Sequence, residues 1–353
     1  MSKLEERLDR VVRNCKKFYN ADSPGHFLLD CHVPFKAPAA KPLYEYDLNI
    51  ELESYLDEQL DTAREKWSVK EKIKDDTIPS ICPRFGIAEH SAWLGQPVKL
   101  QEDTCLAEPV LHSPYDLRKL VSTEESEWFG YMERGYRHLH KRKDGTFLLS
   151  VRGTMMPMDI ANALRGNAFF TDVVLEKAFL HDLSKFLVKA IQWYYRYLLA
   201  WSDTVGGGHI FWMPESWLPA KTLAHVSNDA AMLCSPGVYR EFGFPYEQEL
   251  VKHYDYVMYH IHNEKMHYVP RLSELKPLSL LQVSHDPKTV SPIEDLDHVM
   301  SLTGGVNLML DADSDQLRAH IEMLKNRNVF FKIWCQDEKE AMDIAEFVRF
   351  HSK

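Results

Sequence analysis

A His-x-His sequence and a later cysteine are the residues of this 353-residue chain best suited to bind a metal ion. His260 and His262 end a buried β-type run that begins at Tyr256. Because alternate side chains of a strand project to the same side, both imidazoles are expected to point together. Cys335 follows another such run, and imidazole and thiolate are the donors that Zn²⁺ prefers. We therefore predict a zinc site of His260, His262 and Cys335. The alternative is that the imidazoles bond loop carbonyls and that Cys335 is a small buried apolar residue.

Further titratable side chains follow neighbouring apolar runs. Asp286 is an additional candidate metal ligand, and His285 beside it is a candidate catalytic residue. Glu215 and Asp229 are candidates for a general base or for a carboxylate that binds substrate. Asp311 either contacts substrate or opens the following helix through an Asx turn.

The substrate pocket is expected to be largely apolar. Trp212 and Met156 are predicted to form its wall, although isolated residues of these types are more often part of the core. Arg84, after a short strand at 80–87, is a candidate substrate-binding residue. At most two of the four candidate arginines, which are Arg84, Arg152, Arg165 and Arg271, are expected to reach the pocket.

A repeated strand–helix pattern must position these residues. Apolar β-type runs at 147–151, 209–213, 256–262, 278–284, 306–310 and 329–334 alternate with helical periodicity. Strands buried on both faces indicate a parallel sheet, and the lack of a Gly-x-Gly-x-x-Gly sequence favours a closed barrel over a dinucleotide-binding fold. Barrel enzymes carry their chemistry at the C-terminal ends of the strands. We predict a single (β/α)8 barrel over residues 76–353, with residues 1–75 packed outside it as a helical and irregular cap.

Helix-start signals add detail to this prediction. Ser2 is expected to cap a first helix, and the Ser122-x-x-Glu125 capping box another. A long helical region covers 158–201, with an interruption near Gly166. A last helix covers 338–350.

Composition narrows the class of partner. The chain has 42 Lys and Arg against 52 Asp and Glu, a net charge of −10, so nucleic acid is not an expected partner. No apolar stretch approaches the roughly 18 residues of a membrane span, and no signal-peptide core is present. Six widely spaced cysteines without a Cys-x-x-Cys pair predict reduced thiols. These features predict a cytoplasmic enzyme that acts on a small molecule.

The order of several motifs resembles the uroporphyrinogen decarboxylase superfamily. The matching passages are Gly153–Ala161 with Leu164-Arg165-Gly166, Asn228-Asp229-Ala230, Ser235-Pro236 with Pro245-Tyr246, and Tyr259–Asn263. The resemblance runs from about Leu94 to the C-terminus. It implies a (β/α)8 barrel that is often dimeric, so a homodimer is expected, with the site at the strand ends.

Within that superfamily, the chain is more similar to the zinc-dependent methyltransferases than to true uroporphyrinogen decarboxylases. The decarboxylases carry substrate-binding arginines in an N-terminal passage, whereas the corresponding residues 28–35 contain none. The methyltransferases carry His-x-Cys and a later Cys, and here Cys335 follows His262 by 73 residues. The resemblance implies metal-dependent methyl transfer between a small substrate and a corrinoid protein or a thiol. Two alternatives are a metal-independent decarboxylase or lyase that uses Asp229 and His262, and a barrel that binds a ligand or corrinoid protein without turnover.

Overall fold

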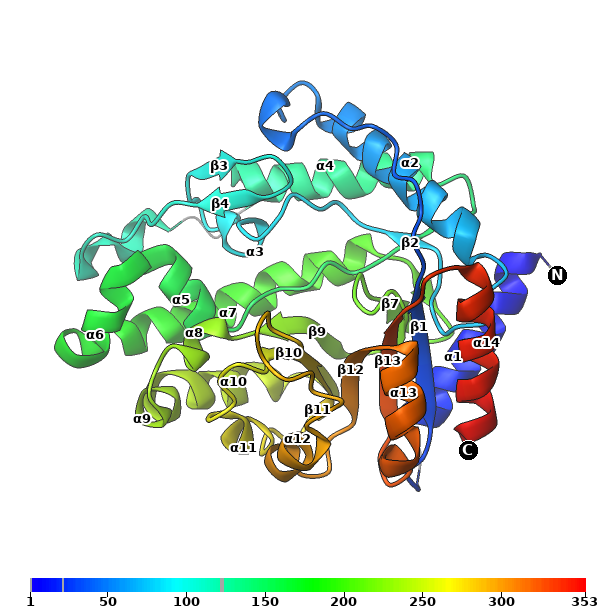
Figure 1. Ribbon diagram of the computed structural model, residues 1–353. Helices are drawn as coiled ribbons and strands as arrows, with labels where there is room; N and C mark the ends of the chain where they lie inside the picture. Colours follow the sequence, from blue (N-terminus) through cyan, green and yellow to red (C-terminus); the bar gives the residue numbers. More distant parts are fainter. Residues whose placement is uncertain (1, 21, 121–123) are drawn as a thin grey trace.

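A parallel sheet of six strands forms the centre of the computed structural model, which describes residues 2–20, 22–120 and 124–353 (Figure 1). The spatial order is β9-β10-β11-β12-β13-β1, and all neighbouring pairs are parallel. The strands are β1 (Phe27–His32), β9 (Thr222–Ser227), β10 (Tyr256–His262), β11 (Leu278–Ser284), β12 (Leu308–Asp313) and β13 (Val329–Trp334). The predictions for β10, β11 and β13 are confirmed at both ends. β12 extends through Asp311, which the sequence placed after the strand.

Three strand assignments differ from the predictions. The run at 209–213 joins no strand of the six-stranded sheet, because β7 (Gly208–Ile210) pairs antiparallel with β6 (Thr204–Val205) and β8 (Trp217–Pro219). The residue after β7, Phe211, forms a single parallel bridge with Val151, just beyond β5. The strand β9 was not predicted. β1 was assigned to the outer cap, yet it pairs with β13 along its whole length. Asp30 and His32 interrupt the apolar character of β1, which conceals it as a sheet strand in the sequence.

A second, two-stranded parallel sheet lies beside the first. It pairs β2 (Ser80–Ile81) with β5 (Leu148–Leu149). Beyond β5 the chain continues along β9, where the Thr154 amide donates to the His225 carbonyl at 3.1 Å. Gly153 permits this close approach, because a Cβ atom there would lie 2.3 Å from the His225 carbonyl oxygen. The remaining short antiparallel pair is β3 (Val98–Leu100) with β4 (Cys105–Ala107).

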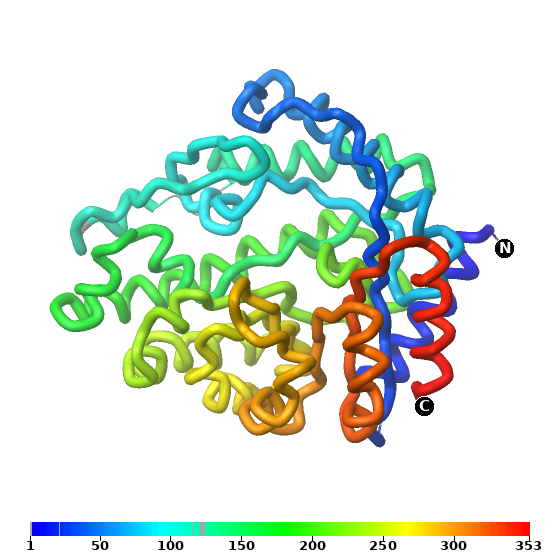
Figure 2. Tube along the Cα trace, viewed as in Figure 1, coloured from blue at the N-terminus to red at the C-terminus, as the bar shows by residue number. Residues whose placement is uncertain are grey.

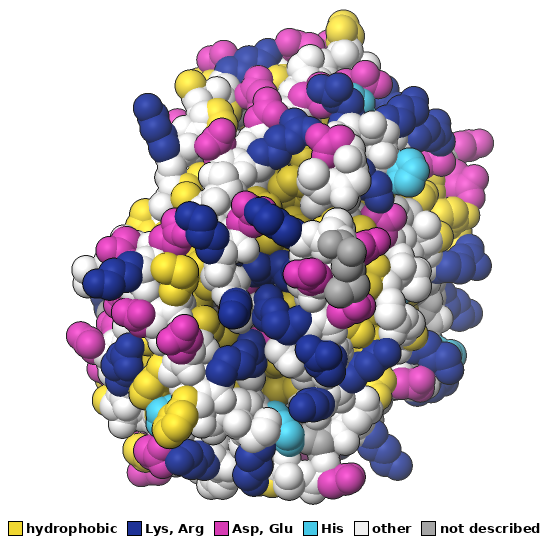
Figure 3. Space-filling view, turned by 90° about the vertical axis from the view of Figure 1, so that its right-hand side faces the viewer, with side chains coloured by type: hydrophobic (Ala, Val, Ile, Leu, Met, Phe, Trp, Pro, Cys, Tyr) yellow, Lys and Arg dark blue, Asp and Glu magenta, His cyan; other side chains and the backbone are white. Residues whose placement is uncertain are grey.

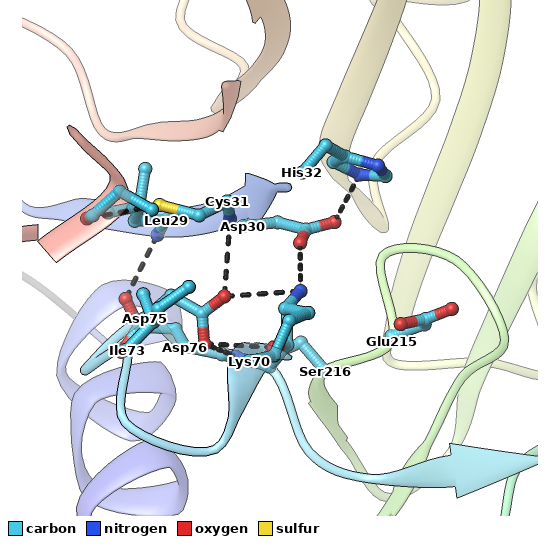
Figure 4. Close-up of polar contacts among 12 residues, drawn as sticks. Leu29, Asp30, Cys31, His32, Lys70, Ile73, Asp75, Asp76, Glu215 and Ser216 are labelled. Carbon is cyan, nitrogen blue, oxygen red and sulfur yellow. Dashed lines mark hydrogen bonds and ion pairs between the residues drawn. The ribbon is translucent and has the colours of Figure 1, made fainter. Parts of the chain in front are cut away.

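Carboxylates bond the edge of β1 that faces away from β13. The Leu29 amide donates to Asp76 at 2.9 Å and the Cys31 amide to Asp75 at 3.2 Å. Figure 4 shows Lys70 between two carboxylates, with its Nζ 2.7 Å from Asp30 and 3.2 Å from Asp75. Burial raises the pKa of Asp30, but Lys70 and His32 hold this pKa well below its usual range. This buried charge cluster therefore fastens the chain before β2 to β1.

Helices cover the sheets, and several were predicted. The prediction of a helix after Ser2 is confirmed, because Ser2 forms a capping box at the start of α1 (Lys3–Tyr19). The interruption at Gly166 is also confirmed, since α5 (Pro157–Arg165) ends there and α6 (Phe169–Leu175) and α7 (Lys177–Trp201) follow. Ser122 lies outside the described residues. The other α-helices are α2 (Leu52–Lys70), α3 (Glu89–Ala92), α4 (Glu127–Arg142), α8 (Asp229–Met232), α9 (Pro236–Val238), α10 (Phe244–Val251), α11 (Val269–Leu272), α12 (Leu296–Thr303), α13 (Ser314–His320) and α14 (Glu338–His351).

The C-terminal helix α14 packs against β1, and in Figure 2 the red C-terminal segment lies beside the dark-blue strand. Just after α14 the Lys353 amide donates to the Gly25 carbonyl at 2.9 Å. Figure 3 shows the face on this side, where Lys and Arg side chains are interspersed with Asp and Glu. Within the described ranges, no helix is long and apolar enough to cross a membrane.

Candidate functional site

Two imidazoles face each other at the C-terminal end of β10. His260 Nε2 and His262 Nε2 lie 3.3 Å apart, which confirms that both rings point to the same side. His260 Nδ1 is 3.0 Å from Gln282 Oε1, and His262 Nδ1 is 2.7 Å from Asp286 Oδ1. The Nε2 atoms of the two rings face each other, and the tautomer of each ring decides which nitrogens carry protons. If both Nδ1 atoms donate to these oxygens, the two Nε2 lone pairs converge on one point.

A third histidine extends this pair toward β9. The His225 ring lies 4.8 Å from the His260 ring, and its Nε2 is 3.3 Å from Gln282 Oε1. Burial lowers the pKa of His260 and lowers that of His225 well below its usual range. Both rings are therefore neutral at pH 7, which is the form that binds a metal ion.

Two carboxyl groups follow on from His262, with Asp229 beside that ring and Asp159 beside Asp229. Asp229, the first residue of α8, places Oδ1 3.9 Å from His262 Nε2, and this buried oxygen has no hydrogen-bond partner among the described residues. Asp159, on α5, accepts from the Ala230 amide at 2.8 Å. Burial and the Asp229 carboxylate raise the pKa of Asp159 to about 7. One carboxyl is thus poised to exchange a proton near neutral pH beside another carboxylate.

A cavity of about 250 Å³ lies against Trp212, and none of the imidazoles or carboxylates described above is part of its lining. Its lining includes three predicted site residues, Arg84, Trp212 and Glu215. Glu215 is ion-paired with Lys66, their nearest atoms being 2.6 Å apart. The Trp212 ring lies 5.2 Å from the His225 ring, so it forms the wall between the cavity and the imidazoles. The predicted apolar wall is only partly present, since charged residues also line this cavity.

Cys335, the third predicted zinc ligand, follows β13, which β11 and β12 separate from β10 in the order of the sheet. Its sulfur lies instead 3.9 Å from the Ile333 carbonyl, and a hydrogen bond with Cys31 lowers the pKa of Cys335. The described ranges contain no group of three or more His, Cys, Asp or Glu already placed to hold a metal ion. Cys335 thus contacts Cys31 on β1, and the same absence of a preformed group applies to His260, His262 and Asp229, whose donors are of a suitable kind.

Other predicted residues have different positions. Asp286 bonds His262 Nδ1, so it orients that ring. His285 is exposed and bonds the Thr289 carbonyl at 3.0 Å, away from the pair. Met156 is fully buried ahead of α5 and does not line the cavity, because its backbone bonds β9. Asp311 lies on β12, 3.9 Å from Lys332 Nζ.

The candidate arginines divide into two groups. Arg84 lines the cavity, and the Arg152 guanidinium carbon lies 3.9 Å from the centre of the Trp212 ring. Arg165 pairs with Asp172 on α6 and Arg271 with Glu274, both outside this cavity lining. Sequence reasoning gave no role to His225, Gln282 or Asp159. The apolar residues on both sides of His225 are a signal in the sequence, since they mark the buried strand β9.

Comparison with known proteins adds no family assignment. No protein-family model and no curated protein matches this chain.

Proposed function

We propose that this chain is a metal-dependent (β/α)8-barrel enzyme of the uroporphyrinogen decarboxylase superfamily, which activates a thiol, hydroxyl or water for methyl transfer. The observation that carries the proposal is the 3.3 Å approach of His260 Nε2 and His262 Nε2. In the tautomers in which both Nδ1 atoms carry the protons, two lone pairs at this distance repel each other, and a cation bound between them removes the repulsion. The absence of a matching family model leaves this assignment to the residues and the geometry.

Eight strands that pair in parallel support the barrel. They are the six strands of the central sheet, β1 and β9 to β13, and the pair β2 and β5; the short antiparallel strands are not counted. The pair β2–β5 fits between β1 and β9. On one side the Asp76 amide donates to the Leu29 carbonyl at 2.7 Å, and on the other the Met156 amide donates to the Ser227 carbonyl at 2.9 Å. A closed barrel would bring the ends of all eight strands around the imidazoles.

His260, His262 and Asp229 would hold the metal. When both Nδ1 atoms carry the protons, Gln282 and Asp286 accept from them and fix both rings, an arrangement typical of histidine ligands. Three protein donors leave a position for substrate, and a bound metal lowers the pKa of the group that occupies it. Asp159 accepts or returns the proton released there, because its pKa of about 7 permits both directions at neutral pH.

The proposal that the transferred group is a methyl group rests on the resemblance to the methyltransferases in the sequence. A corrinoid protein must lay a wide apolar face over the site. The cavity beside Trp212 is lined in part by Lys66, Arg84 and Glu215, which are charged. Of the two partners that the resemblance implies, this lining favours a small thiol.

Zinc binding tests the proposal. The chain is stripped with chelator, dialysed, and titrated with Zn²⁺ in a calorimeter. We expect one zinc ion per chain and at least a 100-fold loss of affinity in His260→Ala and His262→Ala, with a smaller loss in Asp229→Ala. Cys335→Ala and His285→Ala are matched controls that should bind as the wild type does. Binding that is absent, or unchanged in His262→Ala, contradicts the proposal.

A second measurement examines the lone pairs directly. ¹⁵N NMR of the metal-free chain should find the Nδ1–H tautomer in both His260 and His262. If Gln282 instead donates its amide to His260, then His260 Nε2–H bonds His262 and no cation is required. That tautomer would overturn the argument.

A metal-independent decarboxylase or lyase is the second candidate. The observation in its favour is the buried Asp159, whose pKa of about 7 suits an acid that protonates a carbanion. Turnover that survives chelation and follows a single ionisation near pH 7, lost in Asp159→Asn, would select this candidate.

A further inference from the structure

Two buried hydrogen-bond donors beside the cavity have no partner. Trp212 Nε1 and Arg152 Nη1 are shielded from solvent and form no hydrogen bond within the described part of the chain. Buried polar groups in folded proteins are almost always bonded, and each one left unbonded costs about 1–3 kcal/mol. An indole N–H and a guanidinium can only donate. The missing partner is therefore an acceptor.

The two donors form one unit. The Arg152 guanidinium carbon lies 3.9 Å from the centre of the Trp212 ring, and its Nε bonds the Glu89 carboxylate. Arg152 is only 6% exposed, so the stacking and this ion pair hold the guanidinium in place. Glu89 is itself fixed, because its Oε2 accepts from the Gly86 amide at 3.2 Å. Nη1 is thus left as the free donor of a positioned group.

The cavity beside this unit favours an anion. Its charged lining residues are Lys41, Lys66, Arg84, Glu58 and Glu215. Lys66 is paired with Glu215 and Lys41 with Glu51, so Arg84 is the lining cation that has no ion-pair partner among the described residues. Ser80 Oγ also lines the cavity and has no hydrogen-bond partner among the described residues. The volume of about 250 Å³ corresponds to roughly eight water molecules, each of which occupies about 30 Å³ in the liquid.

We infer that this site binds the carboxylate of a small substrate through Trp212 Nε1–H and Arg152 Nη1–H. Both donor atoms are covered in the present conformation, and Trp212 lines the cavity whereas Arg152 does not, so binding requires the Trp212 ring to rotate into the cavity. Trp212 also contacts His225, whose ring lies 4.8 Å from that of His260, so the proposed site adjoins the imidazoles. The inference rests on the proposed function only in calling the ligand a substrate.

Matched acids and amides test the inference. The metal-free chain, labelled with ¹⁵N, is titrated to 50 mM with acetate, benzoate or succinate, and separately with acetamide, benzamide or succinamide. The Trp212 indole resonance is identified by its loss in Trp212→Phe. We expect at least one carboxylate to shift this resonance and its amide to bind at least tenfold more weakly.

Variants separate binding from folding. Trp212→Phe keeps the ring and removes the N–H, and Arg152→Lys keeps the charge and removes Nη1. Each should weaken the carboxylate at least tenfold, because a hydrogen bond to a charged group is lost. Trp193→Phe, on α7 away from this cavity lining, is the control and should bind normally. Equal binding of acid and amide, or no shift with any carboxylate, overturns the inference. Zinc affinity is measured separately, so the two proposals can fail independently.

Discussion

Replacing Lys70 by Met should destabilise the fold more strongly than any surface lysine replacement. Lys70 is 1% exposed and pairs with Asp30 at 2.7 Å and with Asp75 at 3.2 Å (Figure 4). Methionine fills a similar volume without the ammonium group. Two buried carboxylates then lose their shared cation, and breaking a buried ion pair in this way costs 3–5 kcal/mol.

The lower end of that range applies here. Asp75 retains its ion pair with Arg7, and Asp30 retains a 2.9 Å contact with His32. We expect a loss of about 3 kcal/mol in the free energy of unfolding. With about 2.1 cal/mol/K of unfolding entropy per residue, this corresponds to a Tm about 4 °C lower for 353 residues.

The destabilisation by Lys70→Met should depend on pH in one direction. In the wild type the pKa values of Asp30 and Asp75 are lowered, so the stability they contribute is present above their unfolded pKa and is lost as the pH falls through the folded values. Without Lys70, burial should raise both pKa values above those of the unfolded chain. The folded variant then takes up protons on acidification, and the destabilisation should shrink as the pH falls from 7.5 to 5.

Urea unfolding of Lys70→Met and Lys72→Met at both pH values measures this difference. Lys72 is the matched control, because its side chain is 75% exposed in a surface ion pair with Glu338. It should change stability by no more than about 0.5 kcal/mol. A loss below 1 kcal/mol in Lys70→Met, or an equal loss at the two pH values, would refute the reasoning.

Two further predictions concern the site itself. Because the pKa of Asp159 is raised to about 7 in the folded chain, the stability that this group contributes is full below its unfolded pKa and is lost as the pH rises through about 7. Asp159→Asn should therefore become more stable relative to the wild type as the pH rises from 4 to 7. A difference in urea unfolding that stays constant over this range would contradict the prediction. Gly153→Ala should destabilise the chain by more than about 2 kcal/mol in urea unfolding and weaken zinc binding, because the new Cβ lies 2.3 Å from the His225 carbonyl oxygen. Gly130→Ala, where a Cβ meets no described atom within 4 Å outside its own helix turn, is the control and should gain about 0.5–1 kcal/mol in the same assay.

The sequence alone was sufficient for elements whose signal is local. β10, β11 and β13 are apolar on both faces, so their runs of Val, Ile, Leu and Phe mark them without reference to any partner. The helix cap at Ser2 and the end of a helix at Gly166 are likewise determined by a few neighbouring residues. The same alternation placed His260 and His262 on one side of a strand.

Only the tertiary structure decided which residues meet. β1 escaped prediction because its polar side chains Asp30 and His32 are satisfied by Lys70 and by each other, and Lys70 lies far away in the sequence. Cys335 has the right chemistry and comes at a strand end, yet β11 and β12 separate its strand from that of His260, and it lies beside Cys31. Asp229 approaches His262 because α8 follows β9, the neighbour of β10. Local pattern determines what a side chain can do, while the order of strands in the sheet determines with which partner it does so.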